Sequence, residues 1–127
     1  MMKSYTDIEQ SKKLIELGID VNTADMMWDD WSLIDEGWKL SVGYYPEIEK
    51  DYGRKCYPAW SLAALAKILP HRIDDRYELV LGKLPDNKGW YVCYDDIDHF
   101  LKHYVTNSNL IDACYEMILK IHEQKLI

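Results

Sequence analysis

The sequence predicts an α+β fold, in which an antiparallel sheet of about four strands has helices packed on one face. Two observations predict this class: helical spacing of apolar residues near both ends of the chain, and two separate pairs of segments with alternating apolar residues. The element order is α-ββα-ββα, and paired strands separated by helices are typical of an antiparallel sheet. A chain of 127 residues has the common length of one domain, so we expect residues 1–127 to fold as one.

The first predicted helix follows Thr6. Thr6 and Glu9 have the spacing of a capping box, in which the threonine hydroxyl accepts a hydrogen bond from the Glu9 amide. Ile8 and Ile15 lie one heptad apart on the apolar stripe, and Gly18 is a suitable end for the helix.

Residues 38–45 predict a half-buried strand, because apolar and polar side chains alternate there. Trp38 falls on the side that we expect to be buried. Residues 26–33 are the expected partner strand. Residues 46–58 contain two prolines and a glycine and predict a loop, and residues 61–70 predict a short helix that Ser61 caps.

The second half of the chain predicts a hairpin followed by a helix. Residues 77–83 and 90–94 form the expected hairpin across a turn at residues 85–89. The sequence does not determine the conformation of residues 95–107. It also leaves open whether the two ββα units are a duplication. The last helix has one apolar stripe that we expect to be buried: Leu110, Cys114, Met117 and Ile121.

The cysteines and the apolar runs restrict the location of the protein. Cys56, Cys93 and Cys114 are widely spaced and form no metal-binding or CxxC pattern. Their apolar neighbours indicate buried thiols, which predict a reducing, cytoplasmic location. No apolar run approaches the roughly 18 residues of a membrane span, so we expect no membrane partner. Phosphate-loop and catalytic motifs are also missing, which predicts no bound cofactor.

The net charge of −7 comes from one segment. Residues 20–51 hold nine acids and two lysines, together with three tryptophans and two tyrosines. A nucleic-acid-binding protein is expected to show a basic patch, so we expect no direct nucleic-acid binding. Aromatic anchors with charged neighbours are typical of protein interfaces, and the natural complement of this segment is a basic protein partner.

We therefore expect a partner-binding face within residues 20–51, with Trp31 as its exposed anchor. The alternative is that Trp28 and Trp38 belong to the core and that the carboxylates only solvate the outer face. The candidate residues of the face are Trp28, Asp29, Asp30, Trp31, Asp35 and Glu36.

A second candidate site contains His99 and His103. If this stretch is helical, the two imidazoles lie one turn apart and can chelate a metal ion, with nearby aspartates adding oxygen ligands. The glutamate of the metalloprotease motif is missing, and a solvated helix face is the alternative.

Three stretches carry a resemblance: residues 5–28 (YTDIEQSKKLIELGIDVNTADMMW), 57–70 (YPAWSLAALAKILP) and 109–127 (NLIDACYEMILKIHEQKLI). Together they resemble an uncharacterised family of short proteins encoded by phages and mobile elements of gut-type bacteria. The resemblance includes both ends of the chain, so it implies one complete domain and a mobile-element setting. It implies no activity, ligand or functional residue.

The sequence therefore predicts a non-enzymatic binding or regulatory protein that acts through a protein partner. Two alternatives stay open. One is a small metal-dependent hydrolase that uses residues 95–103, and the other is a structural component that associates with itself.

Overall fold

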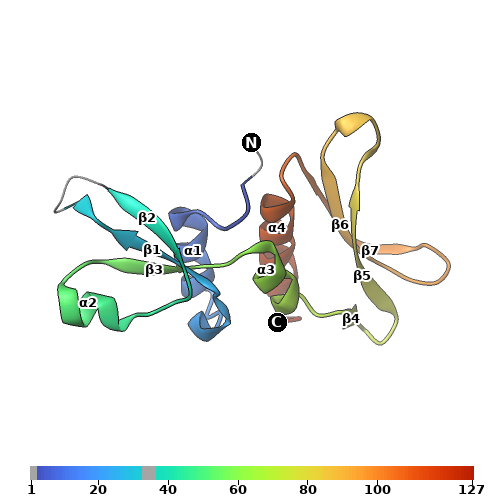
Figure 1. Cartoon of the computed structure of the whole chain (residues 1–127). Coiled ribbons are helices and arrows are strands. Elements are labelled where there is room, and N and C mark those ends of the chain that lie inside the picture. The colour runs from blue at the N-terminus through green and yellow to red at the C-terminus, as the bar shows by residue number, and fades with distance from the viewer. Residues whose placement is uncertain (1–2, 33–36) are drawn as a thin grey trace. The chain divides into compact units, whose positions relative to one another are not determined.

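The computed structural model describes residues 3–32 and 37–127 (Figure 1). Contacts divide the described chain into two compact units, residues 5–64 and residues 3–4 with 65–127. Each unit has its own antiparallel sheet, with three strands in the first unit and four in the second. The α+β class is confirmed, but the strands belong to two sheets and not to one sheet of about four. The single domain over residues 1–127 stays a prediction.

The sheet of the first unit has the order β2-β1-β3. The central strand β1 pairs antiparallel with both neighbours, so that Trp28 faces Leu40 on one side and Tyr57 on the other. The predicted pairing of residues 26–33 with residues 38–45 is thus confirmed for residues 26–30 and 38–42. The strands are β1 (Met26–Asp30), β2 (Trp38–Val42) and β3 (Cys56–Ala59).

The loop predicted at residues 46–58 is wrong in both halves, because it contains α2 (Glu47–Tyr52) and most of β3. Helix α2 ends at Gly53, whose φ of 69° is the left-handed conformation that glycine adopts at helix ends. Pro58 was one of the residues that predicted a loop, but it lies within β3. A proline is tolerated on an edge strand, where its missing N–H can face away from the sheet.

Strand β2 does not have the predicted buried side. Trp38 is 37% exposed and Val42 is 81% exposed, although both were expected to face the core. The reason is the position of β2 at the edge of its sheet, whereas the helix that follows Thr6 packs against β3. Alternation along an edge strand therefore does not identify a buried face in this unit.

The N-cap of helix α1 (Ile8–Glu16) lies one residue later than predicted. The side chain of Asp7, not that of Thr6, accepts a hydrogen bond from the Gln10 amide at 2.8 Å, and the Gln10 side chain bonds back to the Asp7 amide. Thr6 is buried instead, and its hydroxyl accepts the Trp60 amide at 3.1 Å. The 3₁₀ turn η1 (Val21–Thr23) precedes β1.

The sheet of the second unit has the order β4-β5-β6-β7, and all its pairs are antiparallel. The predicted hairpin is confirmed, because β5 pairs with β6 across the 3₁₀ turn η3 (Pro85–Asn87). Residues 95–107, whose conformation the sequence did not determine, form the connection and the second strand of another hairpin. This connection (orange in Figure 1) projects from the sheet. The strands are β4 (Arg72–Ile73), β5 (Tyr77–Lys83), β6 (Trp90–Asp95) and β7 (Leu101–Asn107).

Two helices complete the chain. Helix α3 (Leu62–Ile68) is the predicted short helix, and the Ser61 hydroxyl accepts the Ala64 amide at 3.3 Å. Helix α4 (Leu110–Glu123) packs against β6 and β7. Its predicted stripe is confirmed as buried, and Met117 has no exposed surface. None of the helices in residues 3–32 and 37–127 is long and apolar enough to cross a bilayer.

Candidate functional site

Two of the six predicted partner-binding residues, Asp35 and Glu36, lie outside the described residues. Trp28 has structural contacts: its indole N–H donates to the carbonyl of Thr6 at 3.0 Å, and its ring packs edge-on against Tyr5 with a centroid distance of 5.5 Å. A half-buried indole that is held by a hydrogen bond is not available as a free anchor.

Asp30 ends β1, and its carboxylate is used locally. It accepts hydrogen bonds from the hydroxyl and the amide of Ser32. These two bonds hold the pKa of Asp30 below its ordinary value. In the register of the sheet, Asp30 faces the exposed Trp38 on β2.

Asp29 is a buried ion-pair partner and not a rim acid. It is 5% exposed, and Nε and Nη2 of Arg54 each donate to one of its carboxylate oxygens at 3.1 Å. The indole N–H of Trp31 adds a third donor at 3.0 Å. The hydrogen bond to Asp29 in turn raises the pKa of Arg54. The charge of Asp29 is therefore neutralised within the unit, without any partner.

Trp31 is covered on its ring by cations of the same unit. The Arg54 guanidinium carbon lies 4.2 Å from the ring centroid, and Lys39 Nζ lies 5.3 Å from it. Trp31 is half-buried, so the prediction that it is the exposed anchor is wrong. The exposed indole of this segment is Trp38, which the alternation pattern had placed in the core.

The predicted histidine pair does not lie on a helix. His99 lies in the β6–β7 connection with a φ of 64°, and His103 lies on β7. His99 Nδ1 is 3.7 Å from Asp95, while His103 Nε2 is buried without a hydrogen-bond partner. Burial lowers the pKa of His103. Within residues 3–32 and 37–127, no group of three or more His, Cys, Asp or Glu side chains is placed to hold a metal ion.

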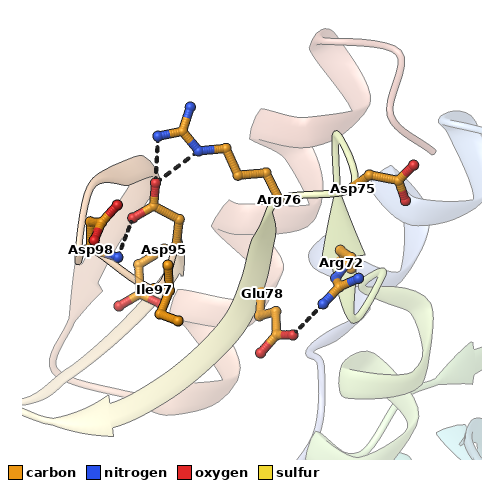
Figure 2. A pocket seen from close by; sticks show the side chains of 8 residues that line it. Arg72, Asp75, Arg76, Glu78, Asp95, Ile97 and Asp98 are labelled. Carbon is orange, nitrogen blue, oxygen red and sulfur yellow. Dashed lines mark hydrogen bonds and ion pairs between the residues drawn. The ribbon is translucent and has the colours of Figure 1, made fainter.

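A cleft of about 480 Å³ opens beside the same connection. Arg72 Nη2 pairs with Glu78 at 2.8 Å across the β4–β5 hairpin, as Figure 2 shows. Arg76 pairs with Asp96, so both arginines of the cleft form ion pairs. The cleft is lined by Arg72, Asp75, Arg76, Glu78, Asp95, Asp96, Ile97 and Asp98.

Asp96 fixes the shape of the β6–β7 connection. The residue is 6% exposed, and its Oδ1 accepts the amides of Asp98 and Phe100, each at 2.9 Å. Its Oδ2 accepts Nε of Arg76 at 2.8 Å and Nη2 at 2.6 Å. The hydrogen bond from Phe100, followed by those from Arg76 and Asp98, lowers the pKa of Asp96, so the carboxylate is ionised at neutral pH.

The fixed connection presents three large apolar side chains, which we call the apolar tip: Ile97, Phe100 and Leu101. Ile97 is 92% exposed, Phe100 is 63% exposed and Leu101 is 53% exposed. The tip was not predicted, because residues 95–103 were interpreted only as a candidate metal site or a solvated helix face. Turn-forming aspartates between two alternating segments, 90–95 and 101–107, were the signal for a hairpin.

The thiols do not offer a reactive group. Cys56, Cys93 and Cys114 are all buried. Burial raises the pKa of each thiol, to about 12 for Cys114. A nucleophilic cysteine needs the opposite shift, so these side chains serve packing.

Comparison of the chain with models of protein families, with curated proteins and with solved structures gives no significant match.

Proposed function

We propose that this chain is a non-enzymatic protein-binding protein and that its contact surface is the apolar tip. The observation that carries the proposal is the exposure of three large apolar side chains within five residues, in a connection that Asp96 holds in one shape. Contiguous exposed apolar surface with a polar border is typical of binding sites.

The hydrogen bonds around Asp96 give the tip a defined conformation before it meets a partner. Two backbone amides and Arg76 converge on this one buried carboxylate. A loop that is already ordered loses less conformational entropy on binding, so more of the contact energy appears as affinity. The ion pair thus supports a role for the loop beyond connecting two strands.

The charges beside the tip favour a partner whose apolar pocket has a basic border. Asp75 and Asp98 line the cleft next to Ile97, whereas Arg72 and Arg76 are already paired with acids. Of the charged side chains that line this cleft, those outside the two arginine ion pairs are all acidic. An acidic border disfavours a bilayer surface that carries anionic lipids.

Residues 20–51 are the second candidate surface. Trp38 is exposed on β2, and Tyr45 and Tyr52 are 53% and 69% exposed. A basic partner at this acidic segment stays a prediction, as does the phage or mobile-element setting. Asp29 and Trp31 contribute less to such a surface than expected, because Arg54 already binds both.

Site-specific photo-crosslinking in the cells that naturally make the protein tests the proposal. A photoreactive phenylalanine analogue at position 97 should give a discrete protein adduct, because Ile97 is almost fully exposed. The matched control is the same analogue at position 88, since Lys88 is exposed in the other long hairpin of the same sheet. Phe100→Ser should reduce the adduct at position 97. Equal adducts at both positions, or none at position 97, would refute the proposal.

A further inference from the structure

The outer edge of β2 exposes a regular row of backbone groups. The Trp31 amide donates to the Gly37 carbonyl at 2.6 Å, and the Gly43 amide donates to the Asp25 carbonyl at 2.7 Å. Because antiparallel pairs alternate along a ladder, odd-numbered residues of β2 bond to β1. The N–H and C=O groups of the even-numbered residues therefore point away from the sheet. These residues are Trp38, Leu40 and Val42.

The other sheet edges are protected. Strand β3 contains Pro58, strand β4 has two residues, and Lys120 Nζ lies 3.4 Å from the Tyr104 carbonyl oxygen on β7. Proline, short length and lysine are common ways of blocking an edge. Among the described strands, β2 is the edge without these features on its outer side, since its lysine, Lys39, lies over the Trp31 ring.

We propose that β2 pairs antiparallel with β2 of a second copy of this chain, in a register centred on Leu40. This register places Leu40 opposite Leu40 and Trp38 opposite Val42, all on one face. The apolar side chains thus meet each other, and an aromatic ring meets a β-branched side chain, which is a favourable cross-strand pair. The result is one continuous sheet of order β3-β1-β2-β2-β1-β3, and the exposed Val42 and Trp38 become covered.

Other twofold registers of β2 are less favourable. A pairing centred on Lys39 would set lysine opposite lysine, and a pairing centred on Ser41 would match only residues 40–42 of the strand with each other. Centring on Trp38 or Val42 would leave four of the five strand residues without a β2 residue opposite them. The register centred on Leu40 also sets Lys39 opposite Ser41, so no like charges face each other within it.

This inference is independent of the apolar tip, which lies in the other unit. A five-residue strand makes a small interface, so the dimer should be weak and concentration-dependent. Each copy carries a net charge of −7, so the copies repel and added salt should strengthen dimerisation. A basic partner at the same segment would show the opposite salt dependence.

The test is sedimentation velocity of the full chain, from about 5 µM to about 500 µM to cover weak dimers. Ser41 is exposed and faces Met27 on β1, so its replacement adds no opposing charge within one chain. Ser41→Lys sets two lysines opposite each other twice per dimer, whereas the matched variant Ser41→Glu sets glutamate opposite Lys39 twice. We expect the dimer Kd to rise about 2- to 30-fold with lysine and to fall by a similar factor with glutamate.

Lysine and glutamate have similarly low strand propensity, so an effect of propensity alone would shift both variants in the same direction. Circular dichroism at about 5 µM, where a weak dimer is dissociated, checks that both variants fold. Phe100→Ser, on the apolar tip, should leave the dimer unchanged. A wild-type chain that is monomeric throughout the range would overturn the inference. Shifts of equal sign in the two Ser41 variants would do the same.

Discussion

The substitution Met117→Ala tests whether helix α4 is the element that closes the core of the second unit. Met117 lies in the middle of α4 and has no exposed surface, and the helix packs against β6 and β7. Its neighbours on the stripe, Cys114 and Ile121, are equally buried. The alanine variant removes every atom beyond Cβ from a site that water does not reach.

The expected loss follows from the burial. Truncating a wholly buried methionine costs about 2–5 kcal/mol, because transfer energy is lost and a cavity is left. For small proteins with a urea m-value of about 1–1.5 kcal/mol per M, a loss of about 3 kcal/mol lowers the midpoint by about 2–3 M. Met117→Leu keeps most of the volume and should cost less than about 1.5 kcal/mol. Glu123→Ala, at the exposed end of α4, should stay within about 0.5 kcal/mol.

Urea titration followed by far-UV circular dichroism measures the three variants. The alanine variant should show the lowest midpoint, with the leucine variant between it and the wild type. If Met117→Ala and Glu123→Ala shift the midpoint by the same small amount, the stripe does not face the core. If alanine and leucine cost the same, the loss comes from the missing methionine sulfur and not from a cavity.

Two further predictions concern single positions of the same unit. Gly89→Ala should strongly destabilise the unit in thermal denaturation, because φ is +113° there and an added Cβ would lie 2.5 Å from the Asn107 carbonyl oxygen; Lys88→Ala, at the exposed neighbour, should have little effect. For Cys114, burial raises the thiol pKa from 9.0 to about 12. The unfolded chain loses this proton above pH 9.0 while the folded chain keeps it, so stability is full below that pH and falls by up to about 4 kcal/mol as pH rises towards about 12. Cys114→Ala should flatten this alkaline loss in titrations at several pH values, and an unchanged slope would contradict the assignment.

Local patterns predicted the elements whose signals are themselves local. The turn at residues 85–89 joins two alternating segments, and residues 110–121 have helical spacing. Both signals depend on neighbours within a few turns of chain, and both elements are confirmed. The cap of α1 was displaced by one residue because Thr6 and Asp7 can both accept the hydrogen bond, and only burial of Thr6 decides between them.

Pairing of distant segments was the part that sequence reasoning could not supply. Strand β3 follows a proline-containing stretch and pairs with β1, which lies about thirty residues earlier. A proline is compatible with an edge strand, so it does not exclude a strand at this position. It indicated a loop because the sequence did not show that β3 lies at the edge of its sheet. Trp38 was predicted to be in the core for the same reason, because the position of its strand in the sheet was unknown. Alternation shows that a strand has two faces but not that either face is covered.

Counting charges by segment failed at the candidate site for a related physical reason. A count by segment does not show which of the nine acids of residues 20–51 have partners beyond residue 51. Asp29 binds Arg54 and Asp25 accepts the amide of Ser61, so two of these carboxylates are satisfied by residues beyond the segment. A carboxylate that is satisfied inside the fold has little energy to offer a partner. The apolar tip and the β2 edge carry the proposals instead, because Ile97, Phe100 and Val42 are each more than half exposed.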